Sequence, residues 1–97
     1  MLLKNYLVVN MNNEEFDNKI KSIFDIEHRD DIHIEHHRYI PTGKPFISIT
    51  IDDGEINSFE LEHLFDICKE NRYVFRDIFT LNDGELVLEF DNLEVEK

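Results

Sequence analysis

Four of the five histidines fall within ten residues of one another, and this cluster is the chain's clearest candidate for a chemical site. On a β-strand, the pattern His33-x-Glu35-x-His37 places two imidazoles and a carboxylate on one face, about 6.5–7 Å apart. Imidazole nitrogen and carboxylate oxygen are common zinc ligands, so these three residues are metal candidates. A structural zinc ion would need a fourth ligand from elsewhere. The alternative is a solvent-facing strand rich in histidine, and we therefore expect no bound metal or cofactor.

Carboxylate pairs could supply general acids and bases or hold magnesium, and the chain has two such pairs, Asp30-Asp31 and Asp52-Asp53. Pairs of this kind are expected by chance in a chain with 22 acids. The chain contains no nucleophile elbow, phosphate-binding glycine loop, HExxH or CxxC motif. The single cysteine, Cys68, lies on the apolar stripe of a predicted helix, where a buried and inert thiol is expected.

A histidine-dependent nuclease using His36 or His37 with Arg38 is the enzyme alternative. An enzyme that acts on a polyanion normally offers a basic cleft, whereas this chain has a net charge of −12. The same charge opposes the phosphate contacts on which nucleic-acid binding depends. The basic-aromatic motif of RNA-recognition domains is also absent. We therefore expect neither catalysis nor direct binding of nucleic acid.

The acidic residues are concentrated in two windows, 45–68 and 77–96, that contain no lysine or arginine. A field of this sign repels nucleic acid and anionic membranes and attracts basic protein surfaces. Carboxylates spaced along a strand or helix can stand where phosphates would in a basic channel. The residues predicted to bind such a partner are Asp52, Asp53, Glu55, Glu60, Glu62 and Asp66 from the first window and Asp83, Glu85, Glu89 and Asp91 from the second. The alternative is that the charge serves only solubility.

These observations predict a small acidic binding protein that inhibits a basic, nucleic-acid-handling protein, with aromatic anchors such as Tyr39 or Tyr73. In size and charge the chain is similar to phage-encoded inhibitors of CRISPR effectors or restriction enzymes, which act as DNA mimics. One alternative is an immunity protein that neutralises a basic toxin nuclease. Another is a homo-oligomeric regulatory module that pairs through edge strands of its sheet.

Length and composition predict one domain over residues 1–97. A single cysteine favours a reducing compartment, and no signal peptide or membrane-spanning stretch is apparent. The expected location is therefore the cytoplasm of a bacterial host cell.

The first half of the chain predicts two strands around a helix, followed by a third strand. Residues 2–10 form the first strand, and a helix capped by Asn12 or Asn13 follows. Its buried stripe consists of Phe16, Ile20, Ile23 and Phe24. Residues 31–40 and 46–52 alternate in polarity around a Pro/Gly-rich turn, which predicts a hairpin. Its inward residues are Ile32, Ile34, Ile40, Ile47, Ile49 and Ile51.

The second half predicts a helix and a second hairpin. Asn57 and Glu60 have the spacing of a capping box, before a stripe of Leu61, Leu64, Phe65 and Cys68. Residues 72–81 form a strand with Tyr73, Phe75, Phe79 and Leu81 on one face. Asn82-Asp83-Gly84 is a turn signal, and Leu86, Leu88 and Phe90 line the returning strand. A change of parity near residues 91–92 indicates a bulge or a strand end.

The predicted order, β-α-β-β-α-β-β, begins with the six elements of a ferredoxin-like fold. We therefore predict an α+β domain whose antiparallel sheet carries both helices on one face and gains an extra C-terminal strand.

Overall fold

The computed structural model describes residues 13–93. A first helix over residues 13–21 is followed by a 3-10 helix η1 (Ile26–Asp31) and by a hairpin of β1 (Ile32–Arg38) and β2 (Pro45–Ile51). Helix α2 (Ser58–Glu70) then leads to a second hairpin of β3 (Tyr73–Thr80) and β4 (Leu86–Asn92). The predicted strand over residues 2–10 and the candidate cap Asn12 lie outside the described residues.

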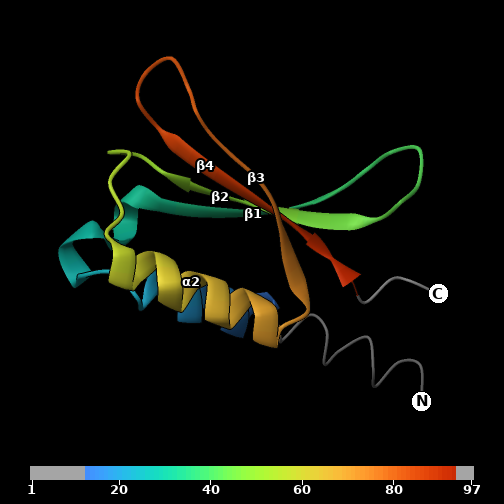
Figure 1. Cartoon of the computed structure of the whole chain (residues 1–97), viewed down its shortest axis with the longest axis horizontal. Helices are drawn as coiled ribbons and strands as arrows, with labels where there is room; N and C mark the ends of the chain where they lie inside the picture. The colour runs from blue at the N-terminus through green and yellow to red at the C-terminus, as the bar shows by residue number, and fades with distance from the viewer. Residues whose placement is uncertain (1–12, 94–97) are drawn as a thin grey trace.

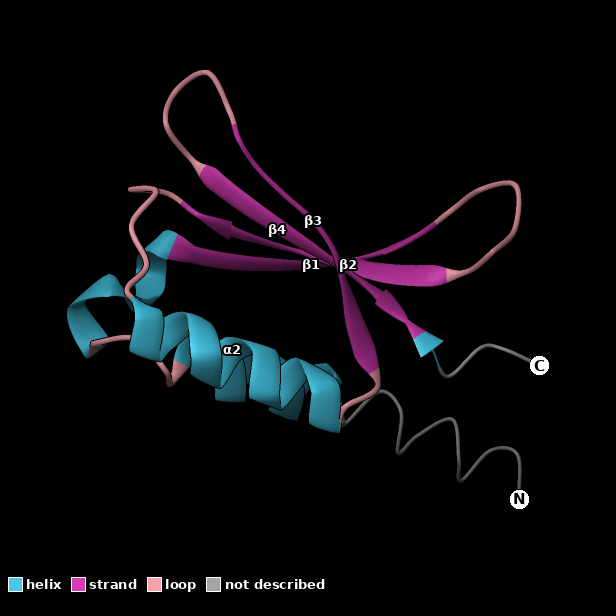
Figure 2. Ribbon diagram, viewed as in Figure 1, coloured by secondary structure: helices cyan, strands magenta, loops and turns pink. Residues whose placement is uncertain are grey.

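The four strands form one antiparallel sheet in the order β1-β2-β4-β3, and both main helices lie against the same face (Figure 1). Among the described residues, no helix or strand covers the other face (Figure 2). We call this second surface the open face. The predicted class, an antiparallel α+β sheet with two helices on one side, is therefore confirmed.

The predicted ferredoxin-like strand order is wrong. In that order, the first strand of the domain would lie between the second strand of the first hairpin and the strand after the second helix. Here β4 holds that position, paired with β2 on one side and with β3 on the other. The last strand was expected to extend the sheet or to form a terminal hairpin. It does form a hairpin with β3, and it is also central in the sheet. Its residues fit a central strand, because Val87 on the open face is buried as well as Leu86, Leu88 and Phe90 on the helix side.

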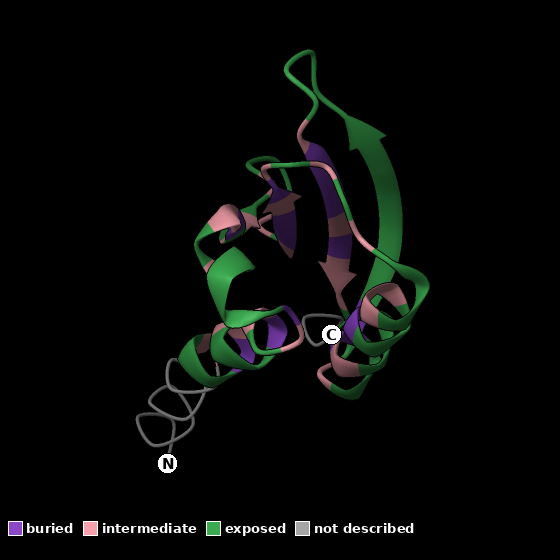
Figure 3. Ribbon diagram, turned by 90° about the vertical axis from the view of Figure 1, so that its left-hand side faces the viewer, coloured by how far each residue is buried: buried purple, intermediate pink, exposed green. Residues whose placement is uncertain are grey.

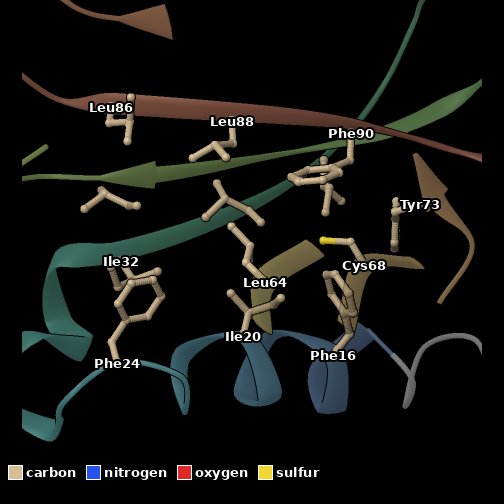
Figure 4. Packing of buried hydrophobic residues seen from close by; sticks show 13 residues of the cluster. Phe16, Ile20, Phe24, Ile32, Leu64, Cys68, Tyr73, Leu86, Leu88 and Phe90 are labelled. Atoms are coloured by element: carbon tan, nitrogen blue, oxygen red, sulfur yellow. The ribbon is translucent and has the colours of Figure 1, made fainter. Parts of the chain in front are cut away.

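The core lies between the sheet and the two helices, and its residues follow the predicted periodicities. Phe16, Ile20 and Phe24 from the first helix and the turn after it meet Leu64 and Cys68 of α2 (Figure 4). Both groups pack beneath the alternating residues of the central strands, which are Ile47, Ile49 and Ile51 in β2 and Leu86, Leu88 and Phe90 in β4. Ile40, predicted to point inward, lies in the turn after β1 and is 94% exposed. Phe65, predicted in the buried stripe of α2, is 37% exposed, because it lies at the margin of the core against Phe75 and Phe90.

Helix α2 begins where its capping box predicts. The Asn57 side chain accepts a hydrogen bond from the amide of Glu60 at 2.8 Å, and Glu60 Oε1 accepts from the amide of Asn57 at 3.0 Å. These two bonds satisfy backbone donors that have no partner within a helix. The start of α2 was therefore predictable from two residues three positions apart.

Strand β3 departs from the predicted alternation because it contains a β-bulge at Arg76. Phe75 pairs with Phe90, whereas Asp77 pairs with Glu89, so Arg76 has no directly opposed residue of its own in β4. Directly opposed residues share a face, which leaves Phe75 and Ile78 on the helix side but turns Phe79 to the open face. The prediction that Tyr73, Phe75, Phe79 and Leu81 share one face is therefore wrong. In β4 the predicted change near residues 91–92 is a strand end, at Asn92.

Candidate functional site

Six acids of the two basic-free windows lie at one end of the sheet. Ile51, at the end of β2, pairs with Ile32 at the start of β1 and with Leu86 at the start of β4. The loop into α2 and the turn between β3 and β4 therefore share this end, which faces the viewer in Figure 3. We call it the acidic end and define it by eight exposed or half-exposed carboxylates, those of Asp25, Asp31, Asp52, Asp53, Glu55, Glu60, Asp83 and Glu85.

Two glycines allow the loops of the acidic end to touch. Gly54 has a φ of +70°, and a Cβ built on it would collide with the carbonyl oxygen of Gly84. Only a residue without a side chain can both take this conformation easily and approach another backbone so closely. Contact between these loops brings Asp53 and Glu55 of the first window toward Asp83 and Glu85 of the second.

The acidic end surrounds a hollow with an apolar floor. Its volume is about 420 Å³, and its carboxylate lining comes from Asp25, Asp31, Asp53, Glu55 and Glu60. Phe24, Ile32, Ile51 and Ile56 supply apolar surface in the same hollow. A lysine or arginine side chain combines an aliphatic stem with a charged tip. This hollow therefore has the chemistry to receive one, with the stem against the floor and the charge among the carboxylates.

Local hydrogen bonds orient several of these carboxylates. Asp53 Oδ1 accepts from the amide of Glu55 at 3.0 Å, and Asp83 Oδ1 accepts from the amide of Glu85 at 3.4 Å. Both are bonds from a side chain to the amide two residues on, the arrangement that fixes an aspartate in a turn. The acids are thus held on ordered turns, which lowers the entropy lost when a partner binds.

Little positive charge lies at the acidic end. Arg29 of η1 brings one positive charge near this end, where its Nε donates to the carbonyl of Phe24 at 3.0 Å. His33 contributes an imidazole, whose Nε2 lies 2.9 Å from Asp52 Oδ2. His28 Nδ1 lies 3.9 Å from Asp31 Oδ2. The carboxylates therefore outnumber the basic groups near them, and the field of this end remains negative.

The remaining predicted partner-binding residues lie elsewhere. Glu62 and Asp66 are exposed on α2, outside the acidic end. Glu89 and Asp91 are on the open face of β4, where Arg76 reaches both. Arg76 Nη2 lies 3.0 Å from Glu89 Oε1, and Arg76 Nε lies 3.2 Å from Asp91 Oδ1. The single positive charge of Arg76 therefore offsets one of these two negative charges.

Arg76 also covers a group of stacked rings on the open face. The rings of Tyr39 and Phe46 stack with centroids 4.4 Å apart, and His37 stacks on Phe46 at 4.9 Å. The Arg76 guanidinium lies 4.9 Å from the Tyr39 and Phe46 centroids, within cation–π range. Loss of hydration raises the pKa of Tyr39, an effect that the Asp91 and Glu89 carboxylates reinforce and the Arg76 charge opposes.

Of the two predicted aromatic anchors, only Tyr39 is accessible. Tyr73 is 9% exposed and packs against Phe16, with ring centroids 5.0 Å apart. It belongs to the core, and the prediction that it anchors a partner is wrong on this ground. Tyr39 is half-buried on the open face and stays a candidate.

The three metal candidates share the open face of β1 but do not converge. His33 is directed to Asp52, whereas His37 Nε2 lies 3.3 Å from Glu35 Oε1 and its ring stacks on Phe46. Within residues 13–93, the potential ligand atoms that do come together, within 4.8 Å, belong to His28, Asp31 and Asp53. The predicted zinc pattern therefore places its residues on one face and brings Glu35 and His37 together, but His33 does not join them.

The residues of the nuclease alternative are also separated. His36 points to the helix side of the sheet, where its Nε2 lies 2.9 Å from Asp17 Oδ1, and His37 is on the opposite face. Arg38 donates to the carbonyl of Gly43 at 2.9 Å. Cys68 is buried, and desolvation raises its pKa to about 12, which agrees with the predicted inert thiol.

Two members of the acidic end were not predicted from the sequence, Asp25 and Asp31. Asp31 was detectable in principle, because a hairpin that starts after Asp31 and ends before Asp52 must place the two residues together. The amide of Asp52 indeed donates to the carbonyl of Asp31 at 2.9 Å. Asp25 has no comparable signal, since its position depends on how η1 folds back against the sheet.

In the part of the chain that the structure describes, no helix has the length and apolar character needed to cross a membrane. Comparison with known proteins gives no family to which the chain can be assigned: no family model, no curated protein and no solved structure matches it.

Proposed function

We propose that this chain is a small acidic binding protein that inhibits a basic, nucleic-acid-handling protein by occupying its DNA or RNA site. The observation that carries the proposal is the acidic end, where eight carboxylates from four segments of the chain gather and five of them line one hollow. The two basic-free windows supply six of them, and the contact between Gly54 and Gly84 joins those windows.

The mechanism follows from charge and shape. Carboxylates of the acidic end take the place of phosphates along a channel lined by lysine and arginine. Long-range attraction speeds the encounter and makes it sensitive to salt. The apolar floor of the hollow then receives the stem of one basic side chain, which adds a contact that salt does not screen. Within this proposal, the chain is a phage inhibitor of a CRISPR effector or restriction enzyme. The alternative with the same mechanism is an immunity protein that neutralises a basic toxin nuclease.

The proposal is tested by a tagged pull-down from host lysate at low salt and at about 0.5 M salt, where screening is strong. The test variant combines Asp52→Asn, Asp53→Asn, Glu55→Gln and Asp83→Asn. The amides at residues 53 and 83 keep the acceptors that their turns require. The control variant carries the same loss of four charges at exposed acids outside the acidic end, Glu14→Gln, Glu15→Gln, Glu62→Gln and Asp66→Asn.

We expect the wild type and the control to retain the same basic, nucleic-acid-binding protein at low salt and to release most of it at high salt. The acidic-end variant should retain this protein at neither salt concentration. If the two variants retain the partner equally, net charge and not the acidic end determines binding, and the proposed site is wrong. If the wild type retains no nucleic-acid-binding protein, the proposed function is wrong.

A further inference from the structure

The outer strand β3 exposes large apolar side chains along nearly its whole length. Only Tyr73 of its eight residues is buried, so that β3 is exposed over most of its length (Figure 3). Val74, Phe75, Ile78 and Phe79 are between 37% and 46% exposed. Strand β3 lies at the edge of the sheet, where its outer backbone groups face no neighbouring strand within the described residues. A long apolar edge of this kind is a template for pairing with another strand.

The opposite edge of the sheet has the reverse character. Strand β1 carries a charged or titratable side chain at five of its seven positions, namely His33, Glu35, His36, His37 and Arg38. Charged side chains along an edge are a common protection against pairing. The two edges of the same sheet therefore differ, and only β3 has the composition of a pairing strand.

We infer that β3 pairs with β3 of a second copy of this chain, antiparallel and about a two-fold axis that passes between Arg76 and Asp77. This register places Arg76 opposite Asp77 of the second copy, and the reverse. The next pair along the strand is Phe75 with Ile78, and the one after it is Val74 with Phe79. The pattern is self-complementary in both charge and apolar character, as an interface with two-fold symmetry requires.

The bulge at Arg76 makes this register possible. In a regular strand neighbouring side chains alternate between faces, so Arg76 and Asp77 would lie on opposite sides and could not face each other across the axis. In β3 both lie on the open face: Asp77 is opposite Glu89, and Arg76 contacts Glu89 and Asp91. Phe75 and Ile78 then share the helix side, while Val74 and Phe79 share the open face. Each proposed pair therefore lies on a single face.

The pairing would also cover Phe75, which lies at the exposed margin of the core. The ring of Phe75 continues the core outward, with centroids 5.4 Å from Phe65 of α2 and 5.7 Å from Phe90 of β4. Its outer side has no cover from the described residues, because β3 is the last strand. Ile78 of the second copy would supply that cover. The two acidic ends of such a dimer would point in opposite directions and stay accessible, so dimerisation neither requires nor prevents the proposed function.

The test is sedimentation velocity of the purified full chain from about 1 to 200 µM, because dimer formation follows mass action. We expect a species of twice the 11.7 kDa chain mass to increase with concentration. The variant Ile78→Lys should weaken dimerisation by at least about tenfold, since a lysine at a sheet edge opposes pairing. The matched control is the same substitution at Ile40, which is 94% exposed in the turn after β1 and should leave dimerisation unchanged.

The register is tested at Asp77. Asp77→Lys places a lysine opposite Arg76 of the second copy and should weaken the dimer by about tenfold, because like charges directly opposed are unfavourable. Asp77→Asn keeps an acceptor for the Ile78 amide and should have a smaller effect. Circular dichroism checks that each variant is folded, and Val74→Lys replaces Ile78→Lys if the latter is not. A wild type that stays monomeric at 200 µM overturns the inference. The inference is also overturned if the dimer is weakened neither by Asp77→Lys nor by the edge variant, Ile78→Lys or Val74→Lys.

Discussion

Gly54 and Gly84, thirty positions apart, are in backbone contact, and this contact joins the two loops that carry much of the acidic end. Among the described residues no ion pair joins one loop to the other, although Asp52 of the first loop pairs with His33 of β1. The acids on both loops repel one another, so the close approach must be stabilised by the fold beneath them. That fold is the pairing of β2 with β4, whose register brings Ile51 opposite Leu86.

Replacement of Gly54 by alanine should destabilise the protein by roughly 2–4 kcal/mol, because it combines a strained φ with a steric collision. Gly43 provides a matched control. Its φ is +72°, but a Cβ there would meet nothing within 4 Å. Gly43→Ala should therefore cost only about 1–2 kcal/mol, the price of the left-handed conformation. Urea denaturation of both variants measures the difference, and equal losses of stability would contradict the contact.

Loss of the α2 cap should also be measurable. Asn57→Ala removes the acceptor for the Glu60 amide and should lower the free energy of unfolding by about 1 kcal/mol. Asn18→Ala, at an exposed position in the first helix, is the control and should change stability by less than about 0.5 kcal/mol. Thermal unfolding by circular dichroism compares the two. A cap variant as stable as the control would show that the capping box contributes nothing.

Arg76 should hold down the pKa of Tyr39. Desolvation raises that pKa, and the positive charge of Arg76 opposes the rise. Arg76→Met keeps much of the side-chain volume but removes the charge, so the Tyr39 pKa should move further upward. Ultraviolet titration of each protein, with its Tyr39→Phe counterpart subtracted, isolates this residue from the other tyrosines. A Tyr39 pKa that is unchanged or lower in Arg76→Met would mean that the guanidinium does not act on the ring.

Cys68 should make stability fall in alkaline solution. Burial raises the thiol pKa from 9.0 to about 12 in the folded chain, so the unfolded chain loses this proton at lower pH. The contribution of Cys68 to stability is therefore full below about pH 9 and is lost as the pH rises toward 12. The stability difference between wild type and Cys68→Ala should shrink over that interval. Urea denaturation at a series of pH values measures it, and a constant difference would contradict the burial of the thiol.

Much of the secondary structure could be predicted because local patterns determine it. The alternation of isoleucines fixed both strands of the first hairpin, and the spacing of Asn57 and Glu60 fixed the start of α2. The bulge at Arg76 could not be predicted in this way. It leaves the sequence of β3 looking regular, and its stabilisation comes from Glu89, Asp91, Tyr39 and Phe46, which lie far away in sequence.

The candidate site was predicted only in part for a related reason. The two acidic windows are visible in the sequence, but their convergence depends on β4 lying between β2 and β3. A ferredoxin-like order would have placed another strand there and kept the turn at Asp83 away from Asp53. The same strand order separates Glu89 and Asp91 from the acidic end, because they follow β4 away from it toward Arg76.

The central claim is that the acidic end occupies a nucleic-acid site, and competition tests it most directly. Fluorescence anisotropy would follow a labelled nucleic acid bound to the captured partner while the chain is added. We expect the wild type and the four-charge control variant to displace the nucleic acid, and the acidic-end variant to displace it poorly. A partner that holds the chain and the nucleic acid at the same time would contradict the claim.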